Sequence, residues 1–392
     1  MRTIGVVTVG RSDYGINFPV LKKIQSDSDL RLWLIVAGMH LSPEFGLTVK
    51  AIEADGFEIV ERVEMLLSSD TPESIAKSMG LGTIGFAQVY GRFRPDILVV
   101  VGDRFEMHAA ALAALPYKIP VAHIHGGELT LGAIDDALRH SITKLSHLHF
   151  VSTREYARRV AQMGEEPWRI MVSGAPSLDN LDSIQMLPRE ELEARYGLHL
   201  HRPPLLVTFH PVTLEYEQVE WQAGELLAAL DEYDIPIVFT MPNADTNGRL
   251  IYRMMADYVQ TRPSSYLVDN LGTEGYFSLM AVAAAMVGNS SSGIIESLSV
   301  KLPVVNIGIR QAGRVKGANV IDVGYTRAEI LGGIRKAIRP DFRQELREVE
   351  NPYGCGQASD KIIERLKTVP LDDRLATKRF HDLSTAPMIE NL

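Results

Sequence analysis

Short apolar runs rich in β-branched residues alternate with helical patterns through the first half of the chain. The runs that predict strands are residues 4–9, 32–36, 97–101, 121–125 and 149–151. Continuous apolar strands separated by helices are typical of a parallel sheet that is covered on both faces. The pattern therefore predicts a Rossmann-like, doubly wound α/β unit.

The second half repeats this pattern. Its predicted strands are residues 205–209, 235–239, 266–268, 304–307 and 320–323. Between the halves, residues 187–204 combine an acidic helical pattern with Gly197, Pro203 and Pro204, which indicates a linker. We therefore predict two domains, residues 1–184 and 185–369, and a charged tail, residues 370–392, that either joins the first domain or frays.

Two doubly wound sheets place the carboxyl ends of their strands on facing edges. Ligands of open α/β sheets bind beyond those ends, at the edge where the loops to the helices begin. We therefore expect the active site in the cleft between the domains. The residues that directly follow the predicted strands are the candidates for its chemistry.

The formal net charge of −9 narrows the possible partners. Nucleic acids and anionic membranes are bound by basic faces, so the sequence predicts neither as a partner. An anionic ligand must instead be held locally, by backbone N–H groups or by small clusters of arginine.

Three features bear on the compartment. The single cysteine, Cys355, excludes an intrachain disulfide and favours a reducing environment. The first residues lack the apolar core and cleavage site of a signal peptide, and no apolar run approaches the roughly 20 residues of a membrane span. The sequence therefore predicts a cytoplasmic protein.

Two loops in the first half carry polar candidates. The loop after the first strand has glycines only at Gly10 and Gly15, which does not fit the GxGxxG fingerprint of dinucleotide-binding proteins, so Arg11 becomes a candidate anion contact. After the strand that ends at residue 101 come Asp103 and Arg104. Capping of the following helix is the alternative role of Asp103.

Ionisable residues crowd together after the strand of residues 121–125. His123 and His125 share one face of the strand, and Glu128, Asp135 and Asp136 follow within a glycine-containing loop and a helix start. This density is more than helix capping requires. A divalent metal is the alternative explanation, but no third ligand arrives at a characteristic spacing, so we predict no metal.

The second half carries the candidates for anion binding. His210 ends a strand, and residues 288–296 join a serine-rich loop to a helix, where hydroxyl and backbone N–H groups could hold a phosphate. A plain capped helix start is the alternative. Residues 308–317 add Arg310, Arg314 and Lys316, enough positive charge to offset a diphosphate.

Taken together, six motifs in this order and spacing resemble the hydrolysing UDP-N-acetylglucosamine 2-epimerases. The motifs are residues 102–106, 125–128, 134–136, 139–144, 288–293 and 310–314. The resemblance covers residues 1 to about 355 and implies a glycosyltransferase-B-like pair of Rossmann domains. It also implies hydrolysis of UDP-N-acetylglucosamine to N-acetylmannosamine and UDP for sialic acid synthesis, by elimination of UDP to a glycal and addition of water. Neither a metal nor a nicotinamide cofactor is implied, and the family suggests homodimers or homotetramers.

The resemblance also implies roles for individual residues. Asp103, Glu128 and Asp135 would form the acid/base set. Some relatives have a carboxylate at the position of His125, so His125 could do its work, and Asp136 could substitute for Asp135. The residues that would hold the nucleotide sugar are Arg11, Arg104, His210, Asn243, Ser290, Ser291, Ser292, Gly293, Glu296, Arg310 and Arg314.

Several alternatives stay open at this point. The same chemistry could act on a UDP-linked 2,4-diacetamido-2,4,6-trideoxyhexose or on a GDP-linked amino sugar. A non-hydrolysing epimerase would add UDP back to the glycal. A nucleotide-sugar binder without activity and a glycosyltransferase share the predicted architecture.

Overall fold

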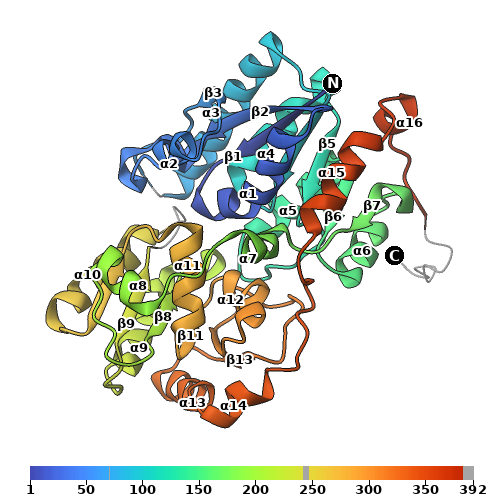
Figure 1. Ribbon diagram of the computed structural model, residues 1–392. Helices are drawn as coiled ribbons and strands as arrows, with labels where there is room; N and C mark the ends of the chain where they lie inside the picture. The colour runs from blue at the N-terminus through green and yellow to red at the C-terminus, as the bar shows by residue number, and fades with distance from the viewer. Residues whose placement is uncertain (70, 242–246, 383–392) are drawn as a thin grey trace, which may run out of the picture.

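The computed structural model describes residues 1–69, 71–241 and 247–382. Within these ranges the chain forms two parallel β-sheets, each flanked by helices, that lie in separate lobes in Figure 1. The first has the order β3-β2-β1-β4-β5-β6-β7 and the second the order β10-β9-β8-β11-β12-β13. In both sheets the strand order reverses beside the first strand, as in a doubly wound fold. The predicted fold class is confirmed.

Strands of the first sheet are mostly buried on both faces because helices cover them. Val99 and Val100 of β4, for example, are fully buried. The bounds are β1 Arg2–Thr8, β2 Leu30–Ala37, β3 Ile59–Val63, β4 Ile97–Val101, β5 Val121–Ile124, β6 Leu148–Val151 and β7 Ile170–Val172. The helices are α1 Arg11–Ser26, α2 Val49–Ala54, α3 Pro72–Arg92, α4 Phe105–Ala114, α5 Asp135–Leu145 and α6 Arg154–Gln162.

The second sheet is built in the same way. Its strands are β8 Leu205–Thr208, β9 Ile237–Thr240, β10 Ser265–Val268, β11 Ala285–Gly288, β12 Val304–Ile307 and β13 Val320–Val323. The remaining helices are α7 Asn180–Ser183, α8 Arg189–Tyr196, α9 Val219–Leu230, α10 Gly248–Thr261, α11 Gly272–Val282, α12 Ser292–Ile295, α13 Arg327–Ala337, α14 Pro340–Glu345, α15 Ala358–Thr368 and α16 Asp373–Ala376. No helix in the described ranges is long and apolar enough to cross a membrane.

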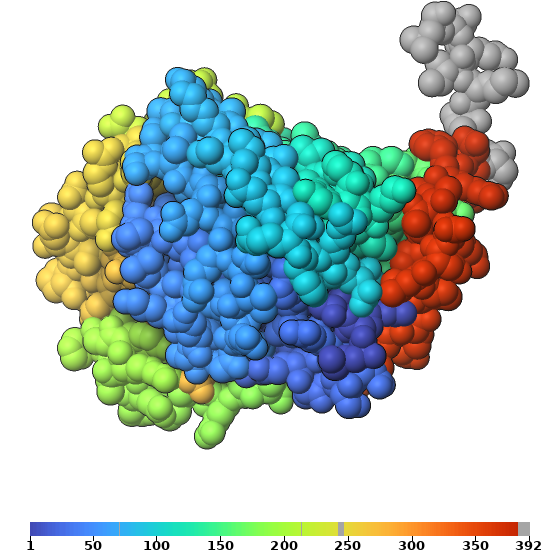
Figure 2. All heavy atoms as spheres, turned by 90° about the horizontal axis from the view of Figure 1, so that it is seen from above, coloured from blue at the N-terminus to red at the C-terminus, as the bar shows by residue number. Residues whose placement is uncertain are grey.

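The C-terminal part of the chain returns to the first sheet. Ile362 and Leu366 of α15 and Leu375 of α16 belong to the same hydrophobic core as the first strands. Figure 2 shows these last helices, in red, against the N-terminal part of the chain. We therefore propose to group residues from α15 to 382 with the first unit, although the sequence prediction ended the second domain at residue 369. The boundary near Ile184 stays a prediction.

Several contacts join the two units at the facing edges of their sheets. Arg11 donates to the carbonyl oxygen of Asp269. The guanidinium of Arg249 bonds both carboxylate oxygens of Glu44, at 2.5 and 2.7 Å. A Cβ atom on Gly132 would lie 2.9 Å from the backbone nitrogen of Arg310, so a glycine is needed where these two loops meet. The carboxyl edges of the two sheets are thus brought together.

Candidate active site

Three neighbouring strands of the first sheet deliver polar residues to one edge. The backbone nitrogen of Gly102 donates to Ile124, and that of His125 donates to Phe150, so β4, β5 and β6 end side by side. His125 and Ser152 follow β5 and β6 directly, and Asp103 follows β4 after Gly102. The register of the sheet therefore places them next to one another.

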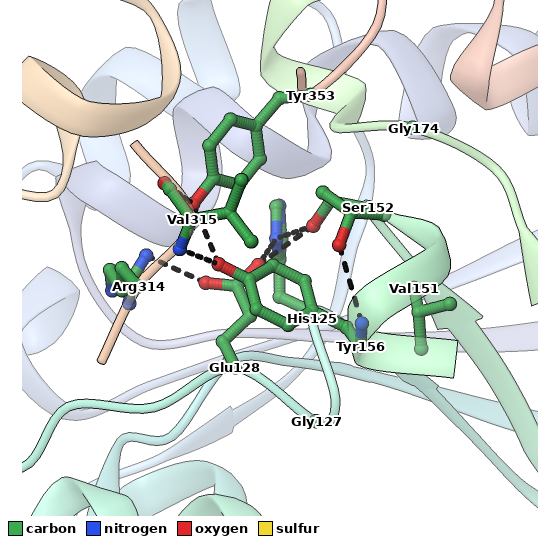
Figure 3. Close-up of polar contacts among 12 residues, drawn as sticks. His125, Gly127, Glu128, Val151, Ser152, Tyr156, Gly174, Arg314, Val315 and Tyr353 are labelled. Carbon is green, nitrogen blue, oxygen red and sulfur yellow. Dashed lines mark hydrogen bonds and ion pairs between the residues drawn. The ribbon is translucent and has the colours of Figure 1, made fainter. Parts of the chain in front are cut away.

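His125 and Glu128 form the centre of a buried polar network. Nδ1 of His125 lies 2.6 Å from Oε1 of Glu128 and 3.0 Å from the hydroxyl of Ser152. The Ser152 hydroxyl also donates to Oε1 of Glu128 at 2.7 Å. Figure 3 shows the three side chains converging, together with Arg314. His125 has a φ of 65°, a left-handed conformation that is uncommon for a residue other than glycine.

Glu128 also binds the second unit. Its Oε2 lies 2.6 Å from Nη1 of Arg314, and both side chains are buried. Burial alone would raise the pKa of Glu128, but Arg314, His125 and Arg139 outweigh it and hold the pKa well below its usual range. Burial opposes the charge of Arg314 as well, yet Glu128 above all raises its pKa. The pair is therefore ionised on both sides.

Two tyrosines fix the loop that carries Arg314. The backbone nitrogen of Val315 donates to the hydroxyl of Tyr156 at 2.9 Å, and the hydroxyl of Tyr353 donates to the carbonyl oxygen of Val315 at 2.8 Å. The two hydroxyl groups are also bonded to each other at 2.8 Å (Figure 3). This pair holds the Arg314 loop of the second unit against the first unit.

Arg139 ties the first-unit residues together. Its guanidinium donates to the carbonyl oxygen of His125 at 2.8 Å, to the hydroxyl of Thr130 at 3.1 Å and to the carboxylate of Asp103. The side chain of Asp103 keeps 19% of its surface exposed. Asp103 is thus positioned by an ion pair and still keeps part of its surface exposed.

Asp135 and Asp136 are the first two residues of helix α5. Oδ1 of Asp136 accepts from the backbone nitrogen of Thr130 at 2.6 Å, and its other oxygen lies 3.6 Å from the imidazole of His140. Asp136 therefore fixes the loop before the helix. Asp135 is half-buried at the first position of α5.

The second unit contributes the serine-rich loop. The side chain of Asn289 bonds the backbone nitrogen and carbonyl oxygen of His210, at 2.7 and 2.8 Å. The backbone carbonyl oxygen of Asn289 accepts from Arg310 at 3.2 Å. A Cβ atom on Gly288 would lie 2.0 Å from the carbonyl oxygen of Thr208, so only glycine allows β11 and β8 to end this close together. His210, Arg310 and the serines 290–292 are thus gathered at one edge.

The predicted helix after this loop is shorter than the sequence suggested. Helix α12 has 4 residues and is followed by a 3₁₀ segment, so its dipole is small. Gly293 lies within α12, and the hydroxyl of Ser292 donates to Glu296. Any anion bound here is held by hydroxyl groups and arginine more than by a helix end.

A second cluster lies beside Arg11 and Arg104 at the ends of β1, β2 and β4. Oδ1 of Asp13 accepts from the hydroxyl of Thr8 at 2.6 Å and from the backbone nitrogen of Val9 at 3.0 Å. Burial raises the pKa of Asp13 to about 7. Arg104 pairs with the buried Glu106, 3.4 Å away. These contacts fix the residues that follow β1 and β4.

The structure thus gathers most of the predicted site residues at the facing sheet edges, while Asn243 lies outside the described residues. The sequence reasoning missed three buried residues of the network, Ser152, Tyr156 and Tyr353, and it gave Arg139, which lies in the motif of residues 139–144, no role in the site. Ser152 could have been found because it follows a predicted strand. Both ring nitrogens of His123 are engaged in hydrogen bonds: they lie 2.7 Å from the carbonyl oxygen of Gly102 and 3.2 Å from the hydroxyl of Thr143.

Proteins with related sequences match nearly the whole chain. A family model described as UDP-N-acetylglucosamine 2-epimerase matches residues 22–367. The chain is 41% identical to the GDP/UDP-N,N'-diacetylbacillosamine 2-epimerase (hydrolyzing) of Campylobacter jejuni, over 97% of this chain and 99% of the relative. It is 38% identical to the UDP-N,N'-diacetylbacillosamine 2-epimerase (hydrolyzing) of Legionella pneumophila, over 96% and 99%. Identity to a UDP-N-acetylglucosamine 2-epimerase of Neisseria meningitidis is 31%, over 98% and 100%.

The fold is also that of a solved structure. The crystal structure of a UDP-GlcNAc 2-epimerase from Neisseria meningitidis bound to UDP-GlcNAc superposes with a TM-score of 0.79 at 20% identity, over 93% of this chain and 99% of that chain. At this identity the similarity concerns the fold. It agrees with the two-domain architecture predicted from the sequence.

Proposed function

Because the chain belongs to the UDP-N-acetylglucosamine 2-epimerase family and is an enzyme of the hydrolysing type, we propose that its substrate is a nucleotide-linked 2,4-diacetamido-2,4,6-trideoxyhexose. The products would be the free 2-epimeric sugar and a nucleoside diphosphate. The two relatives at 41% and 38% identity are both named for N,N'-diacetylbacillosamine, which supports this substrate.

UDP-N-acetylglucosamine is the second candidate substrate, as the sequence motifs implied. A relative named for it is 31% identical along nearly the whole chain, below the two relatives named for the diacetamido sugar. The two sugars differ at carbon 4, where an acetamido group replaces a hydroxyl group, and at carbon 6, where a methyl group replaces the hydroxymethyl group. The base is also left open, because the name of one relative includes both GDP and UDP.

The reaction needs a base for the proton at C2, a group that donates a proton on the opposite face, and stabilisation of the departing diphosphate. The first unit offers Asp103, His125, Glu128, Asp135 and Asp136 for the proton transfers. The second unit offers His210, the serines and Arg310 for the diphosphate, and Glu296 for the ribose. The sugar would therefore lie on the edge of the first sheet and the nucleotide on the second.

The observation that carries this proposal is the meeting of these two sets at facing sheet edges. Acid/base groups come from the ends of β4 and β5, and hydroxyl groups and a cation come from the end of β11 and the loop after β12. A ligand with a reactive sugar at one end and a diphosphate in the middle would span this arrangement.

Proton NMR in deuterium oxide tests the proposal. The purified protein is incubated separately with the UDP-linked diacetamido sugar, its GDP-linked form and UDP-N-acetylglucosamine. We expect the free 2-epimer with deuterium at C2 and the nucleoside diphosphate, formed fastest from a diacetamido substrate. Faster turnover of UDP-N-acetylglucosamine would select the second candidate, and an epimer that keeps its nucleotide would contradict hydrolysis.

A further inference from the structure

We propose that the imidazole of His125 is the base that removes the proton from C2 of the sugar, and that Glu128 is a positioning residue which holds it. This inference rests on the proposed function and decides a question that it leaves open. The resemblance implied Glu128 as a member of the acid/base set, whereas the contacts of the two side chains assign them different roles.

The hydrogen bonds fix the tautomer of His125. Oε1 of Glu128 is a carboxylate oxygen and can only accept, and it lies 2.6 Å from Nδ1 of His125. Nδ1 therefore carries a hydrogen, and in the neutral imidazole Nε2 carries the lone pair. A carboxylate behind an imidazole also stabilises the imidazolium that forms when Nε2 takes a proton.

Nε2 is buried and, among the described residues, has no hydrogen-bond partner. In an imidazole ring the two nitrogens point in nearly opposite directions. Since Nδ1 faces Ser152 at the end of β6, Nε2 points away from that side. A buried nitrogen without a partner is costly in a folded protein, which is consistent with a ligand as its missing partner.

Both oxygens of Glu128 are engaged by neighbouring side chains, whereas Nε2 of His125 is not. Its Oε1 accepts from Ser152 and His125, and its Oε2 lies 2.6 Å from Arg314. The residue has no exposed surface. Its carboxylate therefore keeps its charge and serves the imidazole.

The backbone at His125 is held in its unusual conformation from both sides. Its nitrogen donates to Phe150 at 3.0 Å, and its carbonyl oxygen accepts from Arg139 at 2.8 Å. A φ of 65° costs conformational free energy, which the surrounding structure offsets. Strained backbone conformations of this kind occur where they orient a functional side chain. Here the conformation directs the imidazole of His125 towards Glu128.

The proposed step balances as follows. Nε2 of His125 takes the proton from C2, and the electrons of that C–H bond form the double bond between C1 and C2. The bond between C1 and the diphosphate oxygen breaks, and its electrons leave with the nucleoside diphosphate. The imidazolium, paired with Glu128, then returns its proton to solvent.

His125→Gly tests the assignment, because glycine adopts a φ of 65° readily and leaves a cavity of imidazole shape. We expect the kcat of this variant to fall by roughly 10³-fold on the substrate that the wild type uses. Added imidazole should restore part of the rate, and more basic imidazoles should restore more. Imidazole should not rescue Asp103→Asn, which is the matched control.

A second readout separates proton transfer from a structural role. With substrate deuterated at C2, His125→Gly should have a larger isotope effect on kcat than the wild type, because proton removal becomes rate-limiting. Glu128→Gln should lower kcat by roughly 10²- to 10⁴-fold with little change in KM, because an amide no longer fixes the tautomer of the imidazole or stabilises the imidazolium. His125→Asn, which also tolerates a positive φ, replaces the glycine variant if that variant does not fold.

The outcomes distinguish the two proposals. If the wild type turns over its substrate and the rate of His125→Gly lies within threefold of the wild-type rate, the role of His125 is overturned and the proposed function stands. A large loss without rescue by imidazole and without a larger isotope effect would also overturn it. No turnover by the wild type on any of the three nucleotide sugars would overturn the proposed function and the role of His125 with it.

Discussion

At the scale of single residues, the candidate site depends on charges that are buried and paired. Glu128 bonds His125 and Ser152 through one oxygen and contacts Arg314 through the other. His125 and Ser152 belong to the first unit and Arg314 to the second. One carboxylate therefore connects the orientation of an imidazole with the contact between the two units, and loss of one partner should affect both.

Arg314→Ala should destabilise the protein, because it leaves the carboxylate of Glu128 buried without its main counter-charge. Breaking a buried pair on one side costs about 3–5 kcal/mol of unfolding free energy, which urea denaturation measures. The control is Arg202→Ala, since Arg202 and Asp234 form an exposed pair, whose loss costs at most about 1 kcal/mol. Equal effects of the two variants would contradict the importance of the buried pair.

Arg310→Ala should weaken the binding of the nucleoside diphosphate and leave the fold intact. Arg310 is partly exposed, and a charge-assisted bond to phosphate is worth about 1.5–3 kcal/mol, which corresponds to a loss of roughly 10- to 10²-fold in affinity. Calorimetric titration with UDP and GDP measures it. Lys316→Ala is the control from the same loop, because Lys316 is engaged with Asp322 at 2.7 Å. Unchanged affinity for both diphosphates in Arg310→Ala would place the diphosphate elsewhere.

How far the site could be predicted depends on where its residues lie in the sequence. Asp103, His125 and Glu128 lie in the loops that follow apolar strands, so the pattern identified them. Tyr353 is far from any strand end in the sequence, and only folding brings its hydroxyl to Tyr156. The sequence also could not divide the work between His125 and Glu128, because that depends on which oxygen each partner occupies.

At the scale of elements, the pattern found the strands that are apolar and rich in β-branched residues. The bounds predicted for β4, β12 and β13 agree with the structure. Three strands were missed. β3 is an edge strand with charged residues, β7 has 3 residues, and β11 has alanine, methionine and glycine beside a single β-branched residue, Val287. Their pairing is decided by neighbouring strands that local sequence does not reveal.

Helix α15 begins with a cap from a distant part of the chain. The carboxylate of Asp179 accepts from the backbone nitrogens of Ala358 at 3.0 Å and Ser359 at 2.7 Å. Asp179→Ala should therefore cost about 1–2 kcal/mol of stability and speed hydrogen exchange in α15. Asp372→Ala, which removes the local cap of α16, is the control and should leave exchange in α15 unchanged. Equal exchange of α15 in both variants would show that the remote cap is unimportant.

At the scale of the whole molecule, the two units depend on each other and on the returning C-terminal segment. Arg169 of the first unit donates to the carbonyl oxygens of Arg374, Leu375 and Thr377, which fixes the end of the chain on the first core. Buried groups in this unit also make folding sensitive to pH. Burial lowers the pKa of His40 and His123 to about 3 and that of His147 to about 4.

These shifts predict opposite contributions to acid stability. A histidine with a lowered pKa stabilises the fold above its unfolded pKa of roughly 6.5 and loses that contribution on acidification, so the protein should become less stable from pH 7 towards pH 4. Asp13 acts in the other direction, because burial raises its pKa to about 7. Its contribution to stability is present below its unfolded pKa, near 4, and is lost as the pH rises through 7.

The Asp13→Asn substitution removes this opposing contribution to stability. Urea denaturation should therefore give a steeper acid loss in this variant, by roughly 3 kcal/mol between pH 7 and pH 4.5. Asp257→Asn, an exposed carboxylate on α10, is the control, and parallel curves for wild type and Asp13→Asn would contradict a proton on Asp13 in the native state.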